Sequence, residues 1–206
     1  MFTGIIAAVG IIQCIRPAED GIQIEIFSDT LDLSDVAIGD SIALNGACMT
    51  VVSKMDRYFT VDVSGESLRC TVGLDQQNAL LNLEKALCFG DRLGGHLVSG
   101  HIDGLGQVVK LKPVGKSHEL VILAPQSLAK YLAVKGSVVV NGVSLTINWV
   151  KDTSAGCEFS MNLIPHTIEV TTLKMLQVKD WVNLEVDLLA RYIERLIYLE
   201  KRPGSA

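Results

Sequence analysis

Short stretches that alternate apolar and polar residues dominate the hydrophobic pattern of the chain. Residues 21–27 (GIQIEIF) alternate with a period of two, which is typical of a β-strand with one buried face. Residues 59–63 and 120–123 show a similar pattern. Asn-Gly pairs at 45–46 and 141–142 follow apolar runs, and Asn-Gly between two such runs is the strongest short-range signal of a β-hairpin. The pattern therefore predicts an all-β protein.

This pattern occurs twice along the chain. Residues 2–6 recur as 98–102 and residues 40–51 as 136–147, a shift of 96 positions in both cases; residues 66–71 match 166–171, and residues 82–84 match 183–185. Four blocks in the same order indicate a duplicated domain. Several short strands in each copy favour a small closed barrel, which leaves no exposed strand edge. We expect one barrel in residues 1–97 and a second in residues 98–187.

Helical patterns are scarce. Residues 127–132 predict one short helix, and residues 188–201 predict an amphipathic helix that Pro203-Gly204 would end. The second helix belongs to a separate tail, residues 188–206, which has no counterpart in the first copy. Two interpretations of its apolar stripe remain open, a lid on the second barrel or a contact between copies of the chain.

Composition excludes several classes of protein. Hydrophobic residues make up 49% of the chain and charged residues 20%, enough for two cores and too little charge for disorder. The net charge is −5 without a Lys/Arg stripe, so we expect a small-molecule ligand and no nucleic acid. Five cysteines without a Cys-x-x-Cys pair argue against disulfides and zinc and favour a reducing cytoplasm. With no signal peptide or membrane-spanning run expected, the sequence predicts a soluble, cytoplasmic protein.

Two equivalent positions follow the Asn-Gly pairs. Cys48 and Ser144 each lie two residues after the glycine, and Thr50 and Thr146 each lie two residues further on. One interpretation is packing of small side chains with threonines paired across strands. The other is that each turn brings a thiol or hydroxyl to the open end of a barrel, where small ligands bind.

The start of the second copy carries further candidate chemistry. His101 lies between glycines, and we expect Ser99 and Asp103 to be its same-face neighbours on a strand, which favours function over packing. His96 precedes the restart without a partner in the first copy, so its role is less clear. Asp187 lies just before the tail helix, where an N-cap worth about 1 kcal/mol and a catalytic role are equal alternatives.

Five motifs together resemble the riboflavin synthase alpha-chain family, over nearly the whole chain: residues 1–6 (MFTGII), 45–51 (NGACMTV), 94–101 (GGHLVSGH), 141–146 (NGVSLT) and 163–173 (LIPHTIEVTTL). The resemblance implies two six-stranded antiparallel barrels of one topology and a homotrimer formed through the C-terminal helices. It implies conversion of two molecules of 6,7-dimethyl-8-ribityllumazine into riboflavin and 5-amino-6-(D-ribitylamino)uracil, the last step of riboflavin biosynthesis. No cofactor or metal is implied, and an association with lumazine synthase is left open.

The implied reaction explains why the domain is duplicated. Two identical substrates need two similar pockets, and holding both in reacting geometry can supply roughly 7–11 kcal/mol of the barrier. Differences between the copies let one pocket treat its substrate as donor and the other as acceptor. The chemistry needs a base for the acidic 7-methyl group and a nucleophile or activated water at C7 of the other molecule. We expect His101, with Thr146 or Ser144 nearby, to move the proton, and Cys48 to compete with Ser41 and Ser144 for the nucleophilic role.

Carried over residue by residue, the resemblance assigns catalytic positions to Ser41, Cys48, His101, Ser144, Thr146 and Asp187. It assigns substrate contacts to Gly4, Ile5, Ile6, Met49, Thr50, Asp62, Val63, Ser64, Gly65, Glu66, Ser67, Gly100, Ile102, Lys135, Leu145, Ile164, Pro165, His166 and Thr167. Two positions depart from the family pattern. Ala47 replaces a second cysteine found in some members, and His166 stands where an acidic residue is common.

Two other functions compete with the synthase. The first is a non-catalytic binder resembling lumazine protein, which would not need the intact set of Cys48, His101, Ser144 and Thr146. The second is a flavin-binding barrel of a reductase, against which the chain has no nicotinamide-binding half and no Gly-x-Gly-x-x-Gly fingerprint. The resemblance to the synthase family also implies an active site between the first barrel of one subunit and the second barrel of the next.

Overall fold

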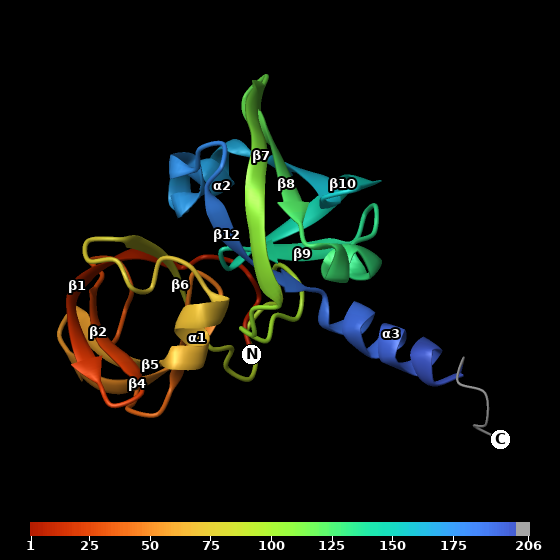
Figure 1. Ribbon diagram of the computed structural model, residues 1–206. Coiled ribbons are helices and arrows are strands. Elements are labelled where there is room, and N and C mark those ends of the chain that lie inside the picture. The colour runs from red at the N-terminus through yellow and green to blue at the C-terminus, as the bar shows by residue number, and fades with distance from the viewer. Residues whose placement is uncertain (201–206) are drawn as a thin grey trace.

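The computed structural model describes residues 1–200 and consists of two closed β-barrels and a C-terminal helix (Figure 1). Each barrel has six antiparallel strands, as the resemblance implies. Around each ring the strands follow the order first, second, fifth, fourth, third, sixth. The strands of the first barrel are β1 (Ala8–Ala18), β2 (Gly21–Phe27), β3 (Ser41–Leu44), β4 (Ala47–Met55), β5 (Tyr58–Ser64) and β6 (Leu80–Lys85). Those of the second are β7 (Gly104–Val114), β8 (Ser117–Ala124), β9 (Ser137–Val140), β10 (Val143–Thr153), β11 (Gly156–Leu163) and β12 (Trp181–Val186).

The duplication predicted from the sequence is confirmed in the details of the strands. β1 shifts register between Ile12 and Cys14, and β7 shifts between Val108 and Lys110. β4 and β10 also shift register at equivalent places. Such bulges bend strands strongly, which a small closed barrel requires. The two copies therefore share their irregularities as well as their order.

Both predicted Asn-Gly hairpins are present. The φ angles are 45° at Asn45 and 87° at Gly46, and 46° at Asn141 and 83° at Gly142. Two successive positive φ angles define the type I′ turn, whose twist suits a tight antiparallel hairpin. The turns connect β3 with β4 and β9 with β10.

Each barrel is filled by its own apolar side chains. Ile24, Phe59 and Leu83 are fully buried in the first core, and Ile122 and Phe159 are fully buried in the second. Burial of each such side chain contributes about 1.5–3 kcal/mol. The barrels therefore have packed interiors, and ligands must bind at their openings.

Two short helices were not predicted. They are α1 (Gly65–Cys70) and α2 (Pro165–Val170), each following the fifth strand of its barrel. The Ser64 side chain caps α1 by accepting from the Ser67 amide, and Pro165 occupies the first turn of α2. Six residues are too few for an apolar period to stand out in the sequence. The helix predicted at 127–132 is confirmed as the 3₁₀ helix η1 (Gln126–Tyr131), and a second 3₁₀ helix, η2 (Thr172–Met175), follows α2.

The predicted strand around His101 is wrong. Residues 99–103 form no strand. In the equivalent residues of the first copy, 1–7, only Phe2 forms an isolated β-bridge, which pairs it with Val98. Gly4 and Gly100 have φ angles of 76° and 80°, which break extended structure. Ser99, His101 and Asp103 are therefore not same-face neighbours on a strand.

The tail helix is confirmed as α3 (Leu188–Glu200), while Lys201 and the predicted stop at Pro203-Gly204 lie outside the described residues. Figure 1 shows α3 extending away from both barrels. Seven of its large apolar side chains, from Leu189 to Leu199, remain 39% to 65% exposed. The lid interpretation is therefore wrong, because a lid would bury this stripe. No helix among residues 1–200 has the length and apolar character needed to span a membrane.

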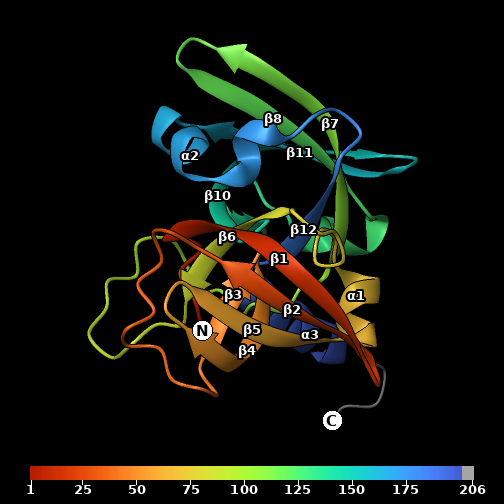
Figure 2. The same ribbon diagram turned by 90° about the vertical axis from the view of Figure 1, so that its left-hand side faces the viewer.

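Four buried asparagines join the barrels. The side-chain amide of Asn82 in β6 donates to the backbone oxygen of Asn141, 2.8 Å away. In the reverse direction, the Asn183 side chain donates to the backbone oxygen of Asn45 at 3.0 Å. Figure 2 shows the two barrels stacked against each other, as these reciprocal bonds require. Buried amides with these partners fix one relative orientation.

Candidate functional site

The residues before each barrel cross to the other barrel. We call residues 2–6 the first crossing segment and residues 98–102 the second. The Gly4 oxygen accepts the Ser144 N–H of the second barrel at 2.8 Å, and the Gly100 oxygen accepts the Cys48 N–H of the first barrel at the same distance. A Cβ on either glycine would lie 2.6 Å from the Cβ of Ser144 or Cys48. Only glycine therefore permits these contacts.

Apolar side chains follow the same exchange. Ile6 packs against the core of the second barrel, and Ile102 packs against the core of the first. Each barrel opening is therefore lined by its own strands and by the crossing segment of the other copy. This arrangement defines two related candidate sites.

Both sites lie where two neighbouring strands separate. β4 and β5 pair as far as Val51 and Val61, after which β4 residues pair with β3 and β5 residues pair with β2. β10 and β11 part in the same way beyond Ile147 and Met161. The crossing segment binds at the edge that the departing strand leaves open.

The first site contains Cys48, with Ser41 and Thr50 facing each other across β3 and β4. The second crossing segment supplies Gly100, His101 and Ile102, and the end of β5 with the first turn of α1 supplies residues 62–67. Cys48 is half-buried, whereas the His101 side chain is exposed.

The second site repeats this plan. Ser144 and Thr146 lie on β10, with Thr146 opposite Ser137, and the first crossing segment supplies Gly4, Ile5 and Ile6. Residues 164–167, including the exposed His166, form the start of α2. Three predicted contact residues have side chains in the barrel cores: Met49 and Val63 in the first barrel and Leu145 in the second. A ligand can therefore contact them mainly through their backbone.

Lys135 has an unusual backbone conformation. Its φ angle is 68°, and its N–H donates to the Ile147 oxygen at 2.8 Å. Gly39 occupies the same place in the first barrel, with a φ angle of 98° and an equivalent bond to Val51. A lysine here costs about 1 kcal/mol more than glycine. This strain beside the second site supports a functional role for Lys135.

His96 is a site residue to which sequence reasoning gave no role. The ring Nδ1 of His96 lies 2.8 Å from the Ser144 hydroxyl, and the backbone N–H of His96 donates to the Thr3 backbone oxygen. Burial lowers the pKa of His96, and the charge of Asp187 opposes this shift. Among residues 1–200 its buried Nε2 has no hydrogen-bond partner. A neutral imidazole there can accept the proton of the Ser144 hydroxyl. The unrepeated Gly94-Gly95-His96 motif was the available signal.

Asp187 caps α3. Its Oδ1 accepts the Leu189 N–H at 2.9 Å, which confirms the N-cap interpretation. The same carboxylate is close enough to influence His96 electrostatically. Its catalytic role stays a prediction.

Within one chain the candidates fall into two groups. Ser144 contacts His96 and Gly4, whereas His101 follows the residue that binds Cys48. No hydrogen bond in the described part of the chain joins His101 to Ser144 or Thr146.

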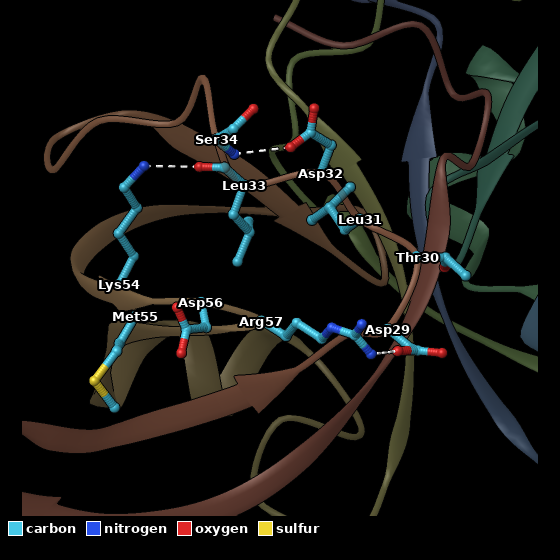
Figure 3. Close-up of a pocket in the computed structure, with 10 residues that line it drawn as sticks. All are labelled: Asp29, Thr30, Leu31, Asp32, Leu33, Ser34, Lys54, Met55, Asp56 and Arg57. Carbon is cyan, nitrogen blue, oxygen red and sulfur yellow. Dashed lines mark hydrogen bonds and ion pairs between the residues drawn. The ribbon is translucent and has the colours of Figure 1, made fainter.

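Neither of two cavities in the single chain contains a whole site. The cavity in Figure 3, about 540 Å³, lies between the start of the β2–β3 connection and the β4–β5 turn, and its charged lining includes Lys54 and the Arg57–Asp29 ion pair. It contains none of the candidate residues. A cavity of about 700 Å³ reaches the first site from the side of Ser41 and also contacts Ile5 and Glu84.

Within residues 1–200, no three His, Cys, Asp or Glu side chains are grouped to hold a metal ion.

Comparisons with known proteins agree with the duplicated site. The family model of the lumazine binding domain matches residues 3–86 and again residues 99–187. The chain is 45% identical to riboflavin synthase of Photobacterium phosphoreum over 98% of its own length and 91% of the relative's. It is 40% identical to riboflavin synthase of Brucella abortus, covering 98% of this chain and all of that protein (100%).

A solved structure shares the same architecture. A crystal structure of LumP complexed with 6,7-dimethyl-8-(1′-D-ribityl)lumazine superposes with a TM-score of 0.77 at 25% identity. The match covers 90% of this chain and 99% of LumP.

Proposed function

The chain belongs to the riboflavin synthase family, and on that premise we propose that its two sites each bind one molecule of 6,7-dimethyl-8-ribityllumazine. The enzyme converts the two molecules into riboflavin and 5-amino-6-(D-ribitylamino)uracil by transfer of a four-carbon unit. The observation that supports this most directly is the pair of equivalent openings, each completed by the crossing segment of the other copy.

Differences between the two sites give them different chemistry. The first site offers the Cys48 thiol and His101, whereas the second offers the Ser144 hydroxyl bonded to His96. His101 removes a proton from the 7-methyl group of the donor, leaving a carbanion delocalised into the pteridine ring. Ser144, whose proton can pass to His96, orients or becomes the nucleophile at C7 of the acceptor, a role for which Cys48 and Ser41 compete.

The pairing of these groups occurs between subunits. His101 belongs to the first site, and Ser144 and Thr146 belong to the second, so a single chain leaves them in separate groups. We propose a homotrimer in which the first site of one subunit faces the second site of the next. The exposed apolar stripe of α3 supplies the contact surface.

Incubation of the purified protein with 6,7-dimethyl-8-ribityllumazine alone tests this function. The expected result is growth of green flavin fluorescence without any added cofactor or metal, together with release of the pyrimidine product. EDTA in the assay should leave the rate unchanged, because the reaction needs no metal.

The second candidate is a lumazine-binding protein without turnover, which the similarity to LumP favours. Its signature in the same incubation is a lumazine spectrum that shifts on binding and then stays constant. Such a result would contradict the synthase.

Location and further partners follow from the same premise. All five cysteines are unpaired, which fits a reducing cytoplasm, where we propose that the enzyme works. Association with lumazine synthase is a further proposal, which copurification of the two proteins from cells would test.

A further inference from the structure

Two buried glutamates bind the crossing segments, and neither was singled out as a site residue from the sequence. Glu84 in β6 accepts from the Thr3 N–H at 2.6 Å, from the Thr3 hydroxyl at 2.6 Å and from the Gly4 N–H at 2.9 Å. Glu185 in β12 accepts from the Ser99 N–H at 2.7 Å, from the Ser99 hydroxyl at 2.6 Å and from the Gly100 N–H at 3.0 Å. The two arrangements are equivalent in every contact.

Both carboxylates are placed where an apolar residue would be expected. Glu84 is 6% exposed and Glu185 is 1% exposed, and their strand neighbours Leu83 and Leu184 fill the barrel cores. A buried carboxylate costs several kcal/mol unless donors compensate it. Burial raises the pKa of both carboxyl groups, while the three donors on each oppose this shift. Closing a barrel does not require such a group, so its presence calls for another reason.

The donors reveal that reason. Glu84 belongs to the first barrel, yet the segment that it binds continues through the Gly4 oxygen to Ser144 and places Ile5 and Ile6 at the second site. Glu185 belongs to the second barrel, and the segment that it binds continues through Gly100 to Cys48 and places His101 at the first site. Each carboxylate therefore lies in one barrel and acts on the site of the other.

We propose that Glu84 and Glu185 are positioning residues that act crosswise, Glu185 setting the geometry of His101 at the first site and Glu84 setting the crossing segment at the second. This inference rests on the proposed function for its effect on turnover, although not for its effect on the backbone. It also explains why both copies retain a glutamate in the same place while their reactive side chains differ.

The experiment compares Glu84→Gln with Glu185→Gln in the full-length chain. Glutamine keeps the size of the side chain but has no charge. Its amide nitrogen is a donor, so one backbone N–H that the carboxylate accepts would face another donor. The first measurement is hydrogen exchange at the Cys48 and Ser144 amides. We expect Glu185→Gln to speed exchange at Cys48 at least tenfold and leave Ser144 unchanged, and Glu84→Gln to do the reverse.

The second measurement is turnover of 6,7-dimethyl-8-ribityllumazine beside the melting temperature. Each glutamine variant should lose at least tenfold in kcat/KM. The matched controls Val61→Ala and Val182→Ala each open a small gap in one barrel core, and neither residue hydrogen-bonds a crossing segment. They should lower the melting temperature at least as much, with kcat/KM within about twofold of the unsubstituted protein.

Milder variants keep the test decisive if a glutamine variant fails to fold. Thr3→Val and Ser99→Ala each remove only the hydroxyl donor and should produce smaller changes in the same crosswise pattern. The proposal is overturned if exchange changes at both amides together, at the amide of the same barrel, or at neither. It is also overturned if kcat/KM falls only in proportion to melting temperature. A chain without any turnover would contradict the proposed function, while the exchange pattern would still decide whether the glutamates act crosswise.

Discussion

At the scale of single residues, the His96–Ser144 pair is the most specific chemistry in the molecule. The two side chains meet at 2.8 Å, and burial lowers the pKa of His96 from its ordinary value of 6.5. The imidazole is therefore neutral at pH 7 and able to accept a proton from Ser144. Asp187 acts in the opposite direction and limits the shift.

This arrangement predicts a pH dependence. Because the pKa of His96 is lower in the folded protein than in the unfolded chain, His96 stabilises the fold fully above pH 6.5, and this contribution falls as the pH drops through the folded pKa. Turnover should show an acid limb below pH 6.5 for the same reason. His96→Gln should remove that limb and lower kcat at least tenfold. An acid limb that persists unchanged in this variant would assign it to another group.

The role of Cys48 can be separated from packing by two substitutions. Cys48 is half-buried, and its N–H binds Gly100, a contact that does not depend on the side chain. Cys48→Ser keeps a polar group that can orient water, whereas Cys48→Ala does not. We expect kcat to fall at least tenfold further in the alanine variant than in the serine variant. Equal rates in the two variants would mean that the side chain only packs.

The sequence predicted single residues well where the repeat displayed them. Cys48 and Ser144 could be found because both follow an Asn-Gly turn at the same distance, and the structure places both against a crossing segment. Glu84 and Glu185 were recognised only as equivalent residues of the repeat. A glutamate in a strand does not indicate from the sequence that three donors bind it. His96 had no partner in the repeat, and its contact with Ser144 depends on tertiary structure.

At the scale of elements, α3 is anchored by one ion pair at its start. Arg191 lies 2.9 Å from the carboxylate of Asp103, which also accepts the Val186 N–H at 2.8 Å. Asp103 directly follows the second crossing segment, two residues after His101, so the anchor ties the tail helix to the end of that segment. Further along the helix, Glu194 binds Lys130 of η1.

Arg191→Met should loosen this connection. The substitution leaves the largely buried Asp103 without its cation, and we expect a loss of about 1–2 kcal/mol in the free energy of unfolding, reduced by the partial exposure of Arg191. Hydrogen exchange in α3 should become faster, and kcat should fall because His101 is less firmly placed. Arg195→Met, on the exposed side of the same helix, is the matched control and should change stability by less than about 0.5 kcal/mol. Equal effects of the two substitutions would contradict the anchor.

Elements were predictable from the sequence in proportion to their length and regularity. The alternating strands and the amphipathic α3 were predicted because each repeats a period several times, and both hairpins were predicted from their Asn-Gly pairs. α1 and α2 were missed because each has only six residues, too few for a helical period to be recognised. Residues 99–103 were expected to form a strand, but the positive φ of Gly100 and the carboxylate of Glu185 hold them in another conformation.

At the scale of the whole molecule, the two barrels are bound together, and His101 and Ser144 belong to different candidate sites. The reciprocal bonds of Asn82 and Asn183 fix the barrels to each other, and the crossing segments complete each site from the other copy. Within the described residues, however, His101 has no hydrogen bond to Ser144 or Thr146. In the proposed homotrimer a second chain brings these groups together, and the exposed apolar stripe of α3 offers the contact surface.

Deletion of residues 188–206 tests that conclusion, because it removes α3 while leaving all twelve strands in place. We expect folded barrels that still bind riboflavin or lumazine, elute as a monomer in size-exclusion chromatography and turn over at least a hundredfold more slowly. The deletion also removes Arg191, so a second variant is needed to separate assembly from the anchor. Leu189→Lys combined with Leu196→Lys places charge on the exposed stripe and keeps Arg191, and it should give the same monomer with the same loss of turnover. A monomer of either kind with full activity would place the active site within one chain and contradict the composite site.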